Sequence, residues 1–151
     1  MDGRELDVLA KILKIKNWRG IHFADQFPRK IKAKNIYVIN CCTSRDANAQ
    51  GHHWLAVYMK SRSSIELFDS AGVRPRQLKH LRLPHHREIY YSGRRLQNYA
   101  SNTCGLYCLF YAKIRSDGAS DWDFMRRYFS KNLNKNDNFI RNWAKKVLRI
   151  S

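Results

Sequence analysis

The sequence predicts an α+β fold in which a central, mostly antiparallel sheet packs between helices. Several short runs of β-prone residues follow one another, and a connector of hairpin length joins two of them. One longer segment is apolar on every side, which is typical of a buried helix. Amphipathic segments with helical spacing lie near both ends of the chain. The 151 residues suit one domain, and we assign residues 1–151 to it.

The first half of the chain is expected to begin with a helix and continue as strands. Leucines at helical spacing in Leu6–Ile15 face away from lysines, which predicts an amphipathic helix. Residues 17–34 are basic and irregular, and Pro28 interrupts any helix there. Four strands are expected, with a hairpin connector at residues 60–63: Ile36–Ile39, Trp54–Met59, Ser64–Phe68 and Glu88–Tyr91.

The second half is expected to be mostly helical. Cys104–Ile114 is the segment that is apolar on all sides, so it predicts a buried central helix. Thr103 directly before it is a good capping residue for the start of that helix. Three further helices are expected, the last two basic and amphipathic: Gln77–Leu83, Trp122–Asn132 and Asp137–Leu148.

The charge balance indicates a polyanionic partner. Lys and Arg number 29 against 12 Asp and Glu, and the net charge is +17. Such an excess opposes compactness by self-repulsion, and nucleic acid is the commonest partner that offsets it. A basic surface that serves solubility alone is the alternative. No base-reading motif is present, so we expect phosphate contacts without sequence preference. The candidate DNA contacts are Arg126, Arg127, Arg141, Lys145, Lys146 and Arg149.

The cysteines and the hydropathy exclude several classes of protein. Cys41, Cys42, Cys104 and Cys108 form no Cys-x-x-Cys pair, so neither a zinc site nor any other metal site is expected. No signal peptide and no apolar stretch long enough to span a membrane is found. We therefore expect an intracellular protein without disulfides or membrane contacts, and we expect a monomer.

Cys104 has the local sequence of a reactive thiol. Thiol chemistry needs a thiolate, which a helix N-terminus or a neighbouring imidazole favours. Cys104 is the first residue of the expected buried helix, and Gly105 after it lets a substrate backbone approach the sulfur. The alternative is that Cys104 is a buried thiol of the hydrophobic core, which is a common role for free cysteine. We assign that role to Cys108, one helical turn later.

Three other residues complete a candidate catalytic centre. His53 precedes one strand of the expected hairpin and Asp69 follows the other, so both come to the same end of the sheet. Asp69 would hold the His53 ring in the right tautomer and stabilise its cationic form. Gln97, with the backbone N–H of Cys104, would donate to a developing oxyanion. None of these residues is a specific signal on its own.

The set resembles the adenovirus maturation protease family, adenain, which shares its fold with the SUMO-deconjugating proteases. The resemblance rests on Gly51–Ala56, Leu67–Asp69, Gln97 and Cys104–Cys108, with a similar upstream segment at Gly20–Pro28. It covers most of the chain, up to about Ile114, and it implies the triad order His, Asp, Cys. In the family the histidine directly precedes a tryptophan, which favours His53 over His52. The same likeness places Trp54 against the catalytic centre, beside Gly105, in the substrate cleft.

The resemblance implies an endopeptidase that cleaves viral or virus-like structural proteins after small residues, often Gly. DNA would be a cofactor, and the location would be the virion or the host nucleus if the source is viral. Two departures are visible. The orienting residue is Asp69 where adenain commonly has Glu, although SUMO proteases use Asp. The stretch His85–Tyr91 has no cysteine to hold the activating peptide of adenain, so the need for such a peptide is uncertain.

Other functions remain open at this stage. A deconjugating protease for SUMO or another ubiquitin-like modifier would use the same chemistry on a folded substrate. An acyltransferase could run acetyl transfer with a similar triad. A non-catalytic DNA-binding protein could keep the fold and the charge alone. The intact set of His53, Asp69 and Cys104 favours the enzymes.

Overall fold

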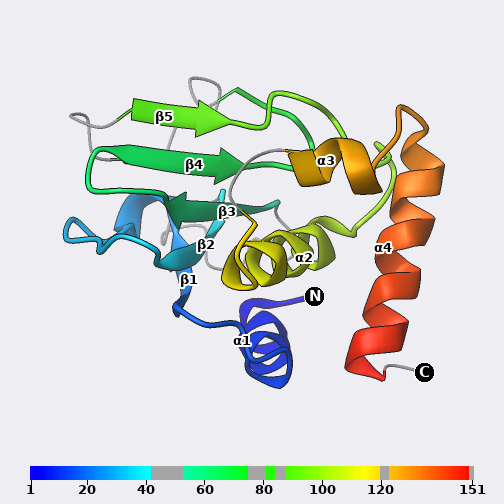
Figure 1. Cartoon of the computed structure of the whole chain (residues 1–151), viewed down its shortest axis with the longest axis horizontal. Coiled ribbons are helices and arrows are strands. Elements are labelled where there is room, and N and C mark those ends of the chain that lie inside the picture. Colours follow the sequence, from blue (N-terminus) through cyan, green and yellow to red (C-terminus); the bar gives the residue numbers. More distant parts are fainter. Residues whose placement is uncertain (42–52, 75–80, 84–87, 120–122, 150–151) are drawn as a thin grey trace.

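A five-stranded mixed sheet forms the centre of the computed structural model, which describes residues 1–41, 53–74, 81–83, 88–119 and 123–149. The strand order is β1-β2-β3-β4-β5, as Figure 1 shows. The outer pairs β1/β2 and β4/β5 are parallel, and the inner pairs β2/β3 and β3/β4 are antiparallel. The strands are β1 (Trp18–Phe23), β2 (Ile36–Asn40), β3 (Trp54–Met59), β4 (Ser64–Phe68) and β5 (Glu88–Tyr91).

Among the described residues, four helices contribute to the core on one face of this sheet, and α2 is the central one (Figure 1). The α2 helix is buried on all sides between the sheet, α1 and α4, as its apolar sequence predicts. Residues on the opposite face of the sheet form a second core, which includes Phe27, Ile31 and Leu83. The helices are α1 (Gly3–Ile12), α2 (Cys104–Ser116), α3 (Asp123–Tyr128) and α4 (Leu133–Leu148), with a short 3-10 turn η1 (Ala24–Gln26).

The main element missing from the sequence prediction is β1. Residues 17–34 were expected to be irregular, yet Trp18–Phe23 pairs with β2. This strand is only partly buried, carries Gly20 at a φ of +87°, and shifts register between Trp18 and Ile21. A short, half-exposed and bulged strand lacks the period-two pattern that identifies a strand. With its parallel pairing, the sheet is mixed and not mostly antiparallel.

Several helix limits also differ from the prediction. The first helix begins at Gly3 because Asp2 and Glu5 form a capping box. The helix expected over Trp122–Asn132 ends at Tyr128, and α4 begins at Leu133, where the Asn132 side chain accepts the Lys135 N–H. Most of the helix expected over Gln77–Leu83 lies outside the described residues, and residues 81–83 are not helical.

A buried ion pair fixes α2 against the sheet. An Arg115 Nη2 lies 2.6 Å from Glu66 Oε1, and both side chains are 1% exposed. Tyr111 donates to the same carboxylate at 2.7 Å. Breaking such a buried pair typically costs about 3–5 kcal/mol, so the C-terminal half of α2 has one position on β4.

Within the described part of the chain, no helix is long and apolar enough to cross a membrane.

Candidate active site

The structure brings His53 and Asp69 together at one end of the β3/β4 hairpin. Ala56 pairs with Phe68 across the two strands, so the residues just outside this register are neighbours. The His53 Nε2 is hydrogen-bonded to Asp69 Oδ1. Asp69 is 1% exposed, and its carboxylate also accepts the backbone N–H groups of Ala71 at 2.8 Å and Val73 at 3.1 Å. The carboxylate is therefore held in one orientation toward the ring.

Cys104 is the first residue of α2, and its thiol lies close enough to the His53 ring for the imidazole to lower its pKa. Burial raises the pKa of Cys104, but the bonds to His53 and to the Trp54 and Gly105 backbones outweigh it, so the pKa is lowered. The helix N-terminus adds to this stabilisation of the thiolate.

The pKa of His53 moves in the opposite direction. Burial lowers it, whereas the hydrogen bonds to Asp69 and Cys104 raise it, with a net value of about 10. A thiol with a lowered pKa beside an imidazole with a raised one favours the thiolate–imidazolium pair near neutral pH. Cys108 differs sharply, because burial raises its pKa well above the usual value and keeps it a neutral core thiol.

Gln97 lies on the neighbouring segment with its side chain fixed at both ends. Its Oε1 accepts the Ser70 hydroxyl at 2.8 Å, and its Nε2 donates to the Ser101 carbonyl at 2.8 Å. Among the described residues it has no hydrogen bond to Cys104. One hydrogen of the Nε2 amide group remains beyond the bond to Ser101, because an amide nitrogen has two donors.

Ser70 is a residue that sequence reasoning missed. Besides its hydroxyl bond to Gln97, its carbonyl accepts the backbone N–H groups of Leu96 at 2.8 Å and Gln97 at 3.0 Å. Ser70 is 1% exposed and directly follows Asp69. It therefore links the segment that carries the carboxylate to the segment that carries the amide. Its position after a strand gave only a turn signal, since the partner is far away in the sequence.

Trp54 and Gly105 lie beside Cys104 and pack against the N-terminal residue, and their role in a substrate cleft stays a prediction. The Trp54 indole N–H donates to the Met1 carbonyl at 3.2 Å. A Cβ placed on Gly105 would come within 3.1 Å of Met1 Sδ and of a Leu6 methyl carbon, and within 3.5 Å of the indole. Only glycine fits there without displacing a neighbour.

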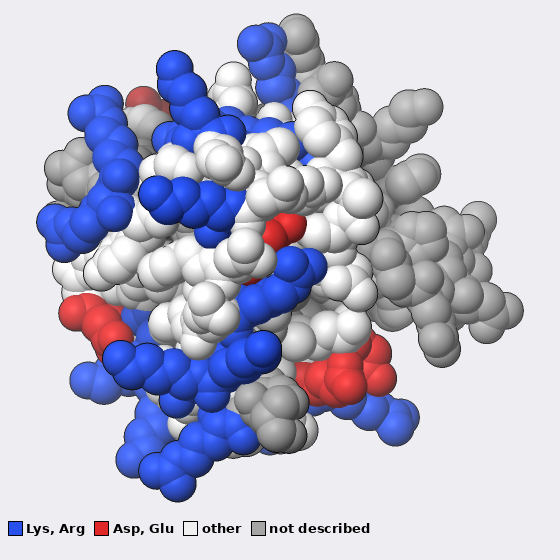
Figure 2. All heavy atoms as spheres, turned by 90° about the vertical axis from the view of Figure 1, so that its right-hand side faces the viewer, with Lys and Arg blue, Asp and Glu red and all other residues white. Residues whose placement is uncertain are grey.

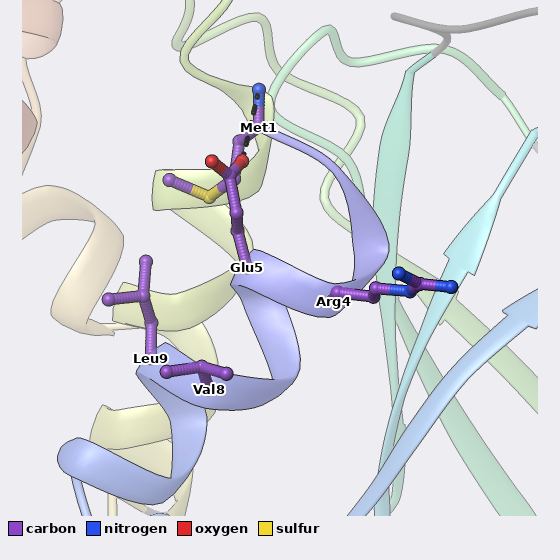
Figure 3. Close-up of a pocket in the computed structure, with 5 residues that line it drawn as sticks. All are labelled: Met1, Arg4, Glu5, Val8 and Leu9. Carbon is purple, nitrogen blue, oxygen red and sulfur yellow. Dashed lines mark ion pairs between the residues drawn. The ribbon is translucent and has the colours of Figure 1, made fainter.

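A cavity of about 580 Å³ opens next to Met1 along α1. Figure 3 shows Met1 and Glu5 side by side at the start of the helix, joined by the ion pair between the N-terminal amine and the carboxylate. Val8 and Leu9 lie further along the same helix, and Arg4 completes the lining. The lining is therefore apolar at one end and charged at the other.

The six candidate DNA contacts are all exposed and lie on α3, on α4 and at the end of α4. Figure 2 shows Lys and Arg side chains over much of the face of the molecule on which α4 lies, with few acidic side chains among them. Arg149, at a φ of +51°, caps α4. Among the described residues, no group of three or more His, Cys, Asp or Glu side chains could hold a metal ion.

Comparison with known proteins identifies the fold. No family model matches the sequence, and no curated protein matches it. The structure is similar to the crystal structure of the ASFV pS273R protease, with a TM-score of 0.52 and 19% identity. The match covers 92% of this chain and 65% of that one. The chain shares the fold of that protein over most of its own length. The chain thus spans somewhat less than two thirds of pS273R.

A second solved structure is similar over almost the whole of both chains. It is the central domain of the uncharacterized Lpg1148 protein from Legionella pneumophila. The TM-score is 0.49 at 17% identity, and the match covers 99% of this chain and 97% of that one.

Proposed function

We propose that this chain is a cysteine endopeptidase in which Cys104, His53 and Asp69 perform the chemistry. The observation that carries the proposal is the place of His53 between Asp69, to which its ring is hydrogen-bonded, and Cys104, whose pKa it lowers, in a fold similar to that of the ASFV pS273R protease. The lowered pKa of the Cys104 thiol and the raised pKa of the His53 imidazole support it further, because perturbed pKa values are common at functional sites.

The reaction follows from these groups. The Cys104 thiolate attacks the peptide carbonyl carbon, and the carbonyl electron pair moves to oxygen to form the oxyanion. The His53 imidazolium gives its proton to the leaving amine as the C–N bond breaks, which leaves a thioester. Neutral His53 then takes a proton from water, the hydroxide adds to the thioester, and the sulfur leaves as thiolate. Asp69 orients the ring and stabilises its cationic form throughout.

The close packing beside Cys104 supports a substrate with small residues at the cleavage site. Met1, Trp54 and the bare backbone of Gly105 come together beside Cys104, which leaves little room for side chains. We propose cleavage after Gly in viral or virus-like structural proteins, as in adenain, with DNA as cofactor. Profiling the purified chain on a peptide library, with and without DNA, tests this. Release of a fluorophore only from conjugates with folded ubiquitin-like modifiers would instead assign a deconjugating protease.

Two other results would assign different functions. Formation of an acetyl-enzyme from acetyl-CoA would indicate acyl transfer. No labelling of Cys104 by a thiol-directed inhibitor, together with DNA binding, would indicate a non-catalytic DNA-binding protein.

Gln97→Ala is expected to lower kcat by about 10²–10³-fold with little change in KM, because an oxyanion donor acts chiefly in the transition state. Steady-state kinetics on a Gly-containing peptide measure it. Ser70→Ala should lower kcat less, since it frees the amide without removing it. Tyr99→Ala is the control, because Tyr99 is 80% exposed and lies close by in the sequence. An unchanged kcat in Gln97→Ala would remove this residue from the site.

DNA binding is expected to be independent of sequence and strongly dependent on salt. For contacts to Z phosphates, log K falls with log salt at a slope of about −0.9Z on duplex DNA. Fluorescence anisotropy with unrelated duplexes measures it. The triple variant Arg141→Gln, Lys145→Gln, Lys146→Gln should bind more weakly and show a shallower slope. A control that removes the same charge elsewhere is Lys16→Gln, Lys34→Gln, Lys60→Gln. Weak binding that ignores salt would contradict the proposal.

A further inference from the structure

A basic cavity lies near the C-terminal end of α2, the end opposite to Cys104. Its volume is about 390 Å³. Four segments that are far apart in the sequence line it: the loop after α1, the loop before β2, the end of β3 and the end of α2. The lining residues are Lys16, Asn17, Lys34, Tyr58, Lys60, Arg115, Ser116, Gly118 and Ala119.

Backbone hydrogen bonds tie these segments into a preformed wall. The Lys16 N–H donates to the Ser116 hydroxyl oxygen at 2.7 Å, and the Ile36 N–H donates to the Asn17 carbonyl at 2.9 Å. The Lys34 N–H donates to the Met59 carbonyl at 2.6 Å. The cavity is therefore set by the fold and not by side-chain positions alone. The Ser116 oxygen accepts a hydrogen bond, so its own proton is free to donate.

The charges around this cavity are not balanced. No acidic side chain lines it among the described residues, and none of Lys16, Lys34 and Lys60 is in an ion pair with a described carboxylate. Arg115 already forms an ion pair with Glu66. Lys60 lies over the Tyr90 ring, 5.3 Å from its centroid. Three lysines from three segments thus line one hollow with no described carboxylate paired to them.

The backbone shape supports a built site. Asn17 and Lys34 both line the cavity in the left-handed region, with φ of +61° and +71°. Non-glycine residues adopt this region at a cost, and they gather at ligand-binding places. The alternative role for the lysines is structural, because cations stabilise a helix C-terminus such as that of α2. The two roles make different predictions.

We propose that this cavity binds the phosphoryl oxygens of a small polyphosphate compound. Lysine is a common point-charge partner of phosphate, and several lysines suit a chain of phosphates better than one. The hydroxyls of Ser116 and Tyr58 and the Asn17 amide would supply further donors. The volume exceeds what one phosphate needs, so tripolyphosphate is expected to bind more tightly than inorganic phosphate. The inference does not depend on the protease chemistry.

Isothermal titration calorimetry of the full chain with tripolyphosphate, in low-salt buffer, tests the site. The triple variant Lys16→Gln, Lys34→Gln, Lys60→Gln should bind at least about tenfold more weakly than wild type. The triple variant Arg141→Gln, Lys145→Gln, Lys146→Gln removes equal charge from α4 and should leave tripolyphosphate binding nearly unchanged. Binding of duplex DNA should show the reverse order for the two variants.

Four outcomes would overturn the proposal. One is wild-type protein that does not bind tripolyphosphate, and another is equal weakening in both variants, which indicates diffuse surface charge. A lowered Tm in the Lys16, Lys34, Lys60 variant with unchanged tripolyphosphate affinity would assign the lysines to the end of α2. If that variant loses DNA binding as strongly as it loses tripolyphosphate binding, the cavity would instead be a contact site for the phosphates of nucleic acid.

Discussion

Cys104→Ala is expected to abolish peptide cleavage and leave the fold unchanged. The substitution removes the sulfur that bonds to His53, while the N-terminus of α2 and its packing against the sheet stay in place. Cys108 cannot replace it, because this thiol is fully buried and its pKa is raised. The rate on a Gly-containing peptide and the circular dichroism spectrum measure the two parts of this prediction. The variant should also lose rapid alkylation by iodoacetamide at neutral pH.

Cys108→Ala is the matched control, because it removes a thiol from the same helix one turn later. It should keep the wild-type cleavage rate and the wild-type alkylation rate. Cleavage by Cys104→Ala at the wild-type rate would contradict the assignment of the nucleophile. Equal loss of activity in both variants, with an altered circular dichroism spectrum, would instead point to damage to α2.

Asp69→Asn is expected to lower kcat on the order of 10⁴-fold, as the equivalent change does in a Ser-His-Asp triad. The amide can present an N–H where His53 needs an acceptor, which favours the wrong tautomer. The change also removes the bond and the charge that raise the pKa of His53, which is about 10 with Asp69 in place. Loss of the His53 proton should therefore occur at lower pH. The alkaline limb of the kcat/KM profile, which reports this step, should move to lower pH.

Asp69→Glu is the conservative control for this experiment. It keeps the charge, so it should retain partial activity and an alkaline limb close to that of wild type. The Ala71 and Val73 N–H groups hold the present carboxylate, so a longer side chain must shift to satisfy them. Equal kcat values and equal pH profiles for Asp69→Asn and wild type would exclude the orienting role.

The sequence predicted the parts of this molecule that have a strong local pattern. The β3/β4 hairpin could be predicted because each strand is a short β-prone run and four residues separate them. The place of Cys104 at the start of α2 followed from the change between polar Asn102-Thr103 and a fully apolar helix. Those two elements are enough to bring His53, Asp69 and Cys104 to one place, because a hairpin aligns its ends and a helix N-terminus points outward.

The features that could not be predicted depend on contacts between distant segments. The β1 strand is stabilised by its pairing with β2 and has little pattern of its own. Ser70 bonds to Gln97 across 27 positions of sequence, and no rule of spacing indicates such a contact. Met1 meets Trp54 in the same way, 53 positions apart. The cavity between Lys16, Lys34 and Lys60 likewise exists only once four segments have assembled.

The buried ion pair between Glu66 and Arg115 determines which thiol, that of Cys104 or that of Cys108, lies beside His53. An α-helix rises about 1.5 Å per residue, so Arg115 fixes the position of Cys104 about 16 Å away along α2. Cys108 lies four residues after Cys104, and a slide of α2 by about 6 Å would exchange the two thiols at His53. That slide would also separate Arg115 from Glu66 inside the core and leave two unpaired charges out of water. The far end of the helix thus excludes the wrong register, without any contact to the reacting atoms.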